Sequence, residues 1–87
     1  MTRLFQPPLP IAVTIVEAQP ATLMWQQQTF HIVHIARRWR VRIWWRDIWR
    51  EYYKLIVQTG ARQPSTALII IYHDLLNKSW YLQQVYD

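Results

Sequence analysis

Arginine and tryptophan are concentrated in one short stretch of this sequence, residues 37–54. Seven of the ten basic residues lie there with only two acidic ones, Asp47 and Glu51, so this stretch carries the whole net charge of +5. Guanidinium groups pair with phosphate oxygens, and aromatic rings stack on bases, so this composition favours nucleic-acid binding. The same residues also suit a small core of buried rings that is covered by arginine side chains.

The nucleic-acid hypothesis predicts a rim of basic side chains and an exposed tryptophan on which bases can stack. The expected nucleic-acid-binding residues are Arg37, Arg38, Arg40, Arg42, Trp44, Arg46, Arg50 and Lys54. Adjacent side chains on an extended chain point to opposite faces, so Trp44 and Trp45 must separate. Trp45 continues an apolar series with Val41 and Ile43, whereas Trp44 falls among the arginines. We therefore expect Trp44 to be exposed and Trp45 to be buried, with Trp25 and Trp80 in the core.

Short β-type segments separated by turn signals must position these residues. We expect strands over residues 11–16, 21–26, 29–39, 52–59, 67–73 and 79–86, with Gln27 and Gln28 at the bend of the first hairpin. Residues 39–45 are expected to be extended and to reach an irregular corner near residues 46–48, with a short helical turn as the alternative. Connections are expected at residues 17–20, 60–65 and 74–78.

Short strands without a long amphipathic helix predict an all-β fold for this chain of 87 residues. We expect a small single-domain barrel, or a strongly twisted antiparallel sheet, of about five or six strands. The domain should span residues 11–87 and follow an extended Pro-rich arm at residues 1–10. Residues 67–73 are apolar on both faces, which is typical of a strand covered on both sides or closed within a barrel. Tyr53, Leu55 and Val57 are expected to point inward.

Catalytic and metal chemistry find little support in the sequence. His73 and Asp74 form a histidine–aspartate pair but lack the further ligands that such a metal motif needs. Asp47 and Glu51 lie among arginines, which are expected to pair with them. His31 and His34 point to opposite faces of one strand, and the single glycine excludes a glycine-rich phosphate loop. We expect no enzymatic activity, no catalytic residues, no cofactor and no metal.

The composition also bears on where the protein works. Cysteine is absent, which excludes disulfides and thiolate zinc sites. The longest apolar run, residues 67–72, is too short for a membrane span, and residues 1–20 lack the apolar core of a signal peptide. We expect a cytoplasmic protein without membrane association. A pI near 10.1 favours acidic partners, nucleic acid first.

The order of the aromatic residues adds a further indication. It runs through Trp25, Trp39, the pair Trp44 and Trp45, Tyr53, Gly60, residues 71–75 and a W-x-L-x-x-V-x-D ending at residues 80–87. This order resembles a family of small uncharacterised bacterial domains found near or fused to Y-family polymerase-like proteins of damage-inducible mutagenesis cassettes. The sequence departs from that family at Gln26, Gln27 and Gln28, where a glycine turn is common, and in its richer arginine content. The family has no established activity, so the resemblance implies a setting in DNA repair or mutagenic translesion synthesis, with polymerase-associated proteins as further partners.

Two function classes follow from these observations. The first is a non-enzymatic accessory module that binds nucleic acid, with single-stranded DNA favoured. The alternative is a protein-protein interaction or self-associating module without direct nucleic-acid contact, in which the exposed aromatic residue is a hot spot of the interface.

Overall fold

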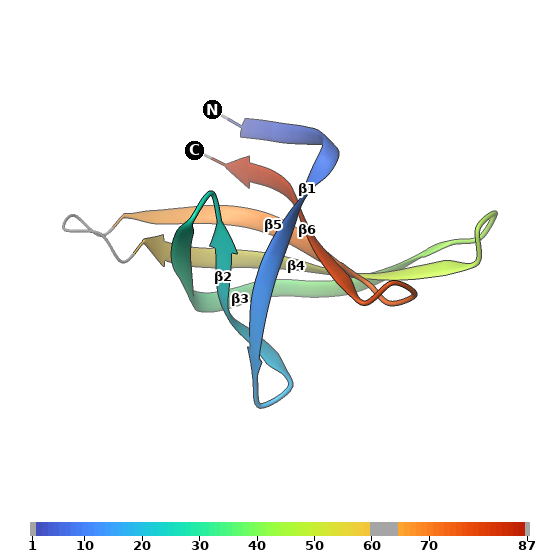
Figure 1. The fold of residues 1–87 in the computed structure, drawn as a ribbon, viewed down its shortest axis with the longest axis horizontal. Coiled ribbons are helices and arrows are strands. Elements are labelled where there is room, and N and C mark those ends of the chain that lie inside the picture. Colours follow the sequence, from blue (N-terminus) through green and yellow to red (C-terminus); the bar gives the residue numbers. More distant parts are fainter. Residues whose placement is uncertain (1, 60–64, 87) are drawn as a thin grey trace.

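Six β-strands form one antiparallel sheet that closes on itself in the computed structural model, which describes residues 2–59 and 65–86 (Figure 1). The strands are β1 (Thr2–Val16), β2 (Gln19–Trp25), β3 (Gln28–Ile43), β4 (Ile48–Thr59), β5 (Thr66–Asp74) and β6 (Ser79–Tyr86). Each strand pairs with the next, and β6 pairs with β1. The predicted all-β class is therefore confirmed, in its closed form. No helix among the described residues is long and apolar enough to cross a membrane.

The first strand begins earlier than predicted. Residues 2–10 are not an arm outside the sheet, because they form the first part of β1 and pair with β6, with Arg3 opposite Val85 and Leu9 opposite Leu82. The register shifts between Leu4 and Leu9, around the two adjacent prolines. Proline has no amide hydrogen to donate, so the pairing is interrupted there while the chain stays extended.

The connections are tight although the sequence carries few turn residues. The β1–β2 turn consists of Glu17 and Ala18, with φ of 53° and 64°, and the β2–β3 turn of Gln26 and Gln27, with φ of 52° and 62°. Two successive positive φ angles are typical of the type I′ turn, which favours Asn and Gly. The predicted bend at Gln27 and Gln28 therefore lies one residue too late.

Two further hairpins turn over four residues each, residues 44–47 and 75–78. Each turn ends at a residue with positive φ, Asp47 at 51° and Lys78 at 57°. The second turn is held by Asp74, whose Oδ1 accepts hydrogen bonds from the amides of Leu76 (3.0 Å) and Asn77 (3.3 Å). The first turn replaces the irregular corner expected near residues 46–48. The predicted loop at residues 60–65 lies outside the described residues except for Ser65.

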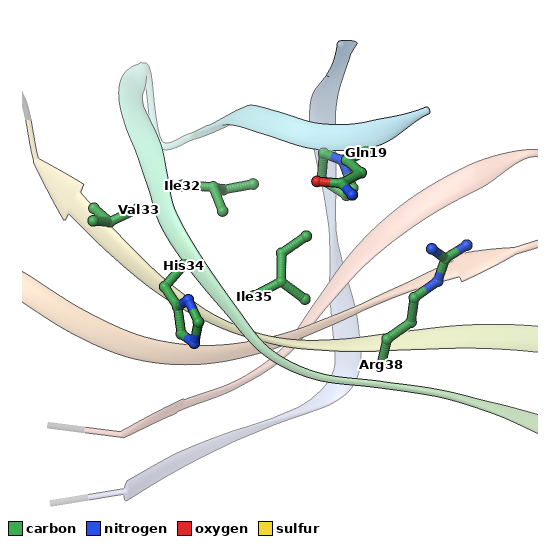
Figure 2. Close-up of a pocket in the computed structure, with 7 residues that line it drawn as sticks. Gln19, Ile32, Val33, His34, Ile35 and Arg38 are labelled. Carbon is green, nitrogen blue, oxygen red and sulfur yellow. The ribbon is translucent and has the colours of Figure 1, made fainter. Parts of the chain in front are cut away.

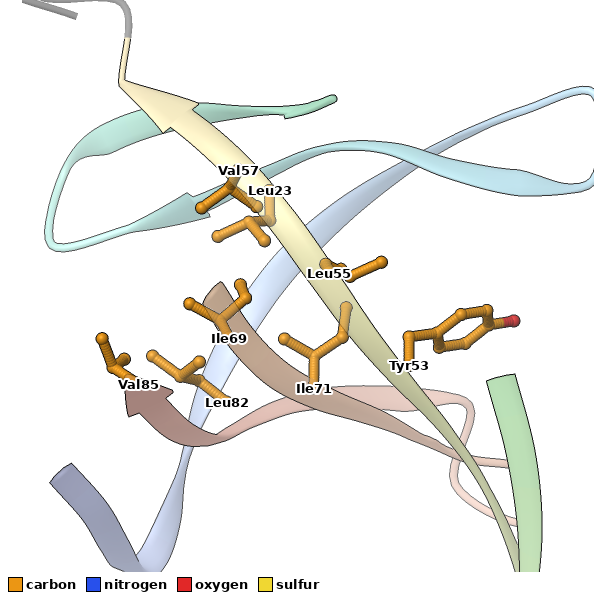
Figure 3. Packing of buried hydrophobic residues seen from close by; sticks show 8 residues of the cluster. All are labelled: Leu23, Tyr53, Leu55, Val57, Ile69, Ile71, Leu82 and Val85. Atoms are coloured by element: carbon orange, nitrogen blue, oxygen red, sulfur yellow. The ribbon is translucent and has the colours of Figure 1, made fainter. Parts of the chain in front are cut away.

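The core fills the inside of the closed sheet (Figure 3). Its buried members are Leu23, Tyr53, Leu55, Val57, Ile69, Ile71, Leu82 and Val85. The predicted inward direction of Tyr53, Leu55 and Val57 is confirmed. Trp25 and Trp80 are partly buried and pack against this cluster. Burial of each of the large aliphatic side chains contributes about 1.5–3 kcal/mol.

Two irregularities in β3 break the expected alternation of its side chains. The register with β4 shifts between Ile32 and His34 and again between Ile35 and Arg37. Val33 is therefore bulged outward and 58% exposed, while Ile32 and Ile35 both pack against the core. The expectation that His31 and His34 point to opposite faces is wrong, because the bulge at Val33 inserts one residue between them and places them opposite Gln58 and Ile56, which share a face of β4.

The β3–β4 hairpin is longer than the rest of the sheet. β3 pairs with β2 only as far as His31, opposite Thr22, but pairs with β4 as far as Ile43, opposite Ile48. β5 accompanies β4 only as far as Arg50, opposite Asp74. The end of the hairpin therefore projects beyond the closed part of the sheet, as the green and yellow-green ribbon of Figure 1 shows.

Candidate nucleic-acid interface

The register of β3 and β4 sorts the predicted basic side chains onto two faces. Residues directly opposite each other in an antiparallel pair share a face. Arg38, Arg40 and Arg42 lie opposite Tyr53, Glu51 and Trp49, on the face that continues the core. Arg37 lies opposite Lys54, and Arg50 lies opposite Val41, on the outer face. Arg46 lies in the turn at the tip. The predicted rim is therefore divided between the two sides of the hairpin.

The basic side chains of the inner face are paired with carboxylates. Glu51 is buried at 4% exposure, and its Oε1 accepts hydrogen bonds from Arg38 Nε (2.5 Å) and from the Tyr53 hydroxyl (2.6 Å). Arg38 Nη2 also pairs with this carboxylate, and Arg40 Nη2 lies 3.3 Å from Oε2. Arg42 Nη2 lies 2.9 Å from Asp47 Oδ1. The expected pairing of Asp47 and Glu51 with arginines is confirmed.

The surroundings of Glu51 keep it ionised. Burial by itself opposes the charge, but the hydrogen bonds from Tyr53 and Arg38 and the charges of Arg38 and Arg40 outweigh it and lower the pKa of Glu51. Burial, together with the hydrogen bond to Glu51, raises the pKa of Tyr53 to about 12. This cluster therefore stabilises the base of the projecting hairpin.

The outer face carries a row of four aromatic rings across β3, β4, β5 and β6. Ring centroids are separated by 5.4 Å from Trp39 to Tyr52, 5.2 Å from Tyr52 to Tyr72 and 5.1 Å from Tyr72 to Tyr81. These spacings are close to the distance between neighbouring strands, so each ring contacts the next across the sheet; the outer pairs are stacked and the Tyr52–Tyr72 pair is tilted by 35°. The part of the three tyrosines in this surface was not predicted from the sequence. In β4 the available signal was the position of Tyr52 between Arg50 and Lys54 on one face.

Basic side chains flank this aromatic row. The guanidinium carbon of Arg50 lies 4.7 Å from the centroid of the Tyr72 ring, and that of Arg37 lies 5.0 Å from the centroid of the Trp39 ring. Tyr52 and Tyr72 have a neighbouring ring on both sides, so neither offers a free face to a base. Trp39 has Tyr52 on one side and, among the described residues, no paired strand on the other. The row of rings therefore ends at Trp39, where the Arg37 guanidinium lies over the indole.

The tip of the hairpin carries two exposed tryptophans. Trp44 is 74% exposed and Trp45 is 69% exposed, and their rings meet edge to face at 5.8 Å. The prediction is confirmed for Trp44 and wrong for Trp45. The strand alternation that would bury Trp45 ends at Ile43, where the turn begins, and the amide of Arg46 donates to the Ile43 carbonyl at 3.1 Å.

The histidine–aspartate pair has structural contacts on both sides. The His73 ring stacks on Trp80 with a centroid distance of 4.2 Å and an interplanar angle of 3°. Burial lowers the pKa of His73, although Glu51 and Asp74 oppose this effect. Asp74 holds the β5–β6 turn. No three His, Cys, Asp or Glu side chains of the described residues are grouped so that they could hold a metal ion.

Comparisons with known proteins give no family for this chain. No protein-family model, curated protein or solved structure matches it. The resemblance to the small domains of mutagenesis cassettes therefore stays a prediction.

Proposed function

We propose that this chain is a non-enzymatic accessory module that binds nucleic acid, with single-stranded DNA favoured. The observation that supports it best is that four basic side chains without a carboxylate partner among the described residues lie on the same hairpin as the exposed tryptophans. In the setting that the resemblance implies, the module acts in the cytoplasm during DNA repair or translesion synthesis, beside polymerase-associated proteins.

The charge available for phosphate comes from four side chains. Arg37, Arg46, Arg50 and Lys54 form no ion pair with a carboxylate among residues 2–59 and 65–86. Arg37 and Lys54 lie directly opposite each other, and Arg46 lies at the tip, in the turn that follows Ile43. From Arg37 to Ile43, its last residue, β3 is about 20 Å long at the rise of an extended strand. Such a length suits a site of about four nucleotides, at the lower end of the range for small β domains.

The aromatic residues favour single strands over duplex. Trp44 and Trp45 are not packed into the core, and Trp39 is the last ring of the aromatic row, with the Arg37 guanidinium over it. Ring faces of this kind stack on any unpaired base, and such contacts contribute about 1–3 kcal/mol per base. In a duplex the bases are already stacked on one another, so these rings would lose most of their contacts.

The test is binding of short fluorescein-labelled single-stranded DNA, single-stranded RNA and duplex DNA, measured by fluorescence anisotropy over a salt series. Four phosphate contacts predict a slope of log K against log salt of about −3 for a single strand. We expect the single strands to bind more tightly than the duplex. Absence of binding at low salt, or binding that is independent of salt, would refute the proposal.

A matched pair of variants locates the site. Arg46→Gln and Lys78→Gln each remove one exposed positive charge from a four-residue hairpin turn. Arg46→Gln should make the slope shallower by about 0.7, whereas Lys78→Gln should leave it nearly unchanged. Equal effects of the two substitutions would show that net charge matters and the projecting hairpin does not.

A further inference from the structure

One edge of β3 has no partner strand over most of its length. On the side of β2 the pairing ends at His31, whereas β4 covers the other side as far as Ile43. No other described strand pairs with residues 32–43 of β3. An uncovered edge presents backbone amide and carbonyl groups that can pair with another extended chain. β-Strand addition to such an edge is a recurring way of binding peptides.

A groove lies where this edge begins (Figure 2). Its volume is about 450 Å³, and it lies between the start of β2, at Gln19 and Pro20, and the part of β3 that includes Ile32, Ile35 and Arg38. Both bulges of β3 lie within this segment, so the backbone there is irregular. Beyond them residues 37–43 pair with β4 without a further shift, so this part of the edge is regular enough to receive an added strand.

The charge of the edge defines the partner. Arg38 and Arg40 share the single carboxylate of Glu51, and Arg37 has no carboxylate partner among the described residues. A second copy of the chain would bring its own arginines against these, and like charges on adjacent strands repel each other. Nucleic acid has no backbone that can pair with amide and carbonyl groups as a strand does. The edge therefore suits an extended polypeptide that carries acidic side chains.

The side chains on the two faces of β3 also determine which types of side chain are favoured at successive positions of the partner strand. On the outer face an added strand would place its residues beside Arg37, Trp39 and Val41, which favours an acidic, an aromatic and an apolar side chain in turn. An aromatic side chain beside Trp39 would continue the row of Trp39, Tyr52, Tyr72 and Tyr81 by one ring. On the inner face the neighbours are Arg38, Arg40 and Arg42, which favour acidic side chains.

We propose that the free edge of β3, at residues 37–43, binds an acidic, extended peptide segment with an aromatic residue beside Trp39, by β-strand addition. This protein-binding surface shares Arg37 and Trp39 with the proposed nucleic-acid site, but peptide binding there does not require that nucleic acid binds. The probe is the peptide Thr-Glu-Val-Glu-Tyr-Glu-Glu, labelled with fluorescein at its N-terminus. When it lies antiparallel to residues 37–43, its tyrosine is beside Trp39 and its last glutamate is beside Arg37.

The experiment compares this peptide with two controls by fluorescence anisotropy on the full chain. The first control has the same sequence with N-methyl groups on alternate residues, which removes backbone donors and keeps every charge. In the second control lysine replaces each glutamate. We expect N-methylation to weaken binding by at least about tenfold and the lysine peptide not to bind. If the N-methylated peptide binds as tightly as the parent, the attraction is electrostatic only and the proposal is wrong.

Two further measurements locate the site. Arg37→Glu should weaken binding of the peptide by about tenfold. Arg3→Glu, the same change on an exposed residue of β1, should change the affinity by less than about twofold. Deuterium exchange of the backbone amides of residues 37–43 should slow when the peptide binds, and an oligonucleotide should not cause this protection. Protection of the same amides without peptide, together with a dimer in sedimentation, would assign the edge to a second copy and overturn the proposal.

Discussion

Replacing Glu51 by glutamine should weaken the fold and strengthen nucleic-acid binding at the same time. The buried carboxylate of Glu51 accepts hydrogen bonds from Arg38 and Tyr53 and pairs with Arg40. Glutamine keeps the shape of the side chain and one carbonyl acceptor. It removes the negative charge that holds the two guanidinium groups on the inner face.

The loss of stability follows from these contacts. A hydrogen bond to a charged group contributes about 1.5–3 kcal/mol and a neutral one about 0.5–1.5 kcal/mol. The Tyr53 hydroxyl is buried, so the full difference applies there. The side chains of Arg38 and Arg40 are 50% and 61% exposed, so water screens most of their share. We expect the free energy of unfolding to fall by about 2 kcal/mol, and the Tm by about 8–16 °C.

The effect on binding has the opposite sign. Release of Arg38 and Arg40 raises the number of unpaired cations on the hairpin from four to six, so the slope of log K against log salt should steepen from about −3 to about −4. Glu17→Gln is the matched control, because it adds the same unit of net charge in the exposed β1–β2 turn. Thermal melts followed by circular dichroism and the anisotropy salt series measure the two effects.

Each half of this prediction can fail separately. An unchanged Tm for Glu51→Gln would contradict the role of the carboxylate in the fold. Equal slopes for Glu51→Gln and Glu17→Gln would show that the arginines of the inner face do not reach the ligand. Weaker binding by Glu51→Gln at a temperature where it remains folded would refute the proposed electrostatic mechanism.

Three further predictions concern single side chains. Trp44→Ala and Trp45→Ala should each weaken single-stranded DNA binding by about 1–3 kcal/mol and change the free energy of unfolding by less than about 0.5 kcal/mol. Trp80→Ala should instead lower the free energy of unfolding by about 3 kcal/mol. Thermal melts showing the reverse order would refute the assignment of Trp80 to the core and of Trp44 and Trp45 to the surface. The folded pKa of His73 lies below its ordinary value of 6.5, so the stability that depends on its neutral ring is present above that value and is lost as the pH falls. The Tm should therefore decrease on acidification below about pH 6.5, and His73→Gln should remove this first decrease. The pKa of Tyr53 is raised from 10.0 to about 12, so its contribution is present below pH 10 and about 3 kcal/mol is lost between pH 10 and 12. Burial also raises the pKa of Tyr72, so absorbance at the phenolate band should show a late ionisation step of buried tyrosines, and Tyr53→Phe should remove one tyrosine from that step.

The fold class could be predicted because its signals are local. The alternation of Tyr53, Leu55 and Val57 marks the inward face of β4, and residues 79–86 coincide with β6. The features that were not predicted depend on local backbone conformations for which the sequence has no clear signal. The bulge at Val33 and the turn at residues 44–47 both interrupt an alternating pattern without a glycine or proline. Trp45 was therefore assigned to the wrong environment.

The candidate site was predictable only in composition. The seven basic residues of residues 37–54 and the exposed Trp44 could be named from the sequence. The division of the arginines into paired and unpaired sets depends on the register of β3 against β4. The aromatic row needs the registers of four strands to agree, including those of β5 and β6, which lie far from Trp39 in the sequence. Long-range register of this kind is set by packing, and a single sequence does not reveal it.

The turns of this domain leave room for a more stable version of it. Glu17, Ala18, Gln26, Gln27, Asp47 and Lys78 all adopt positive φ angles without being glycine. For most residues with a Cβ atom this conformation costs roughly 1–2 kcal/mol, and asparagine and aspartate tolerate it better. Ala18→Gly and Gln27→Gly would remove such a cost at two two-residue turns that lie away from the β3–β4 hairpin tip. The sheet could thus gain thermal tolerance through its tightest bends, without alteration of its core or of the surfaces proposed to bind partners.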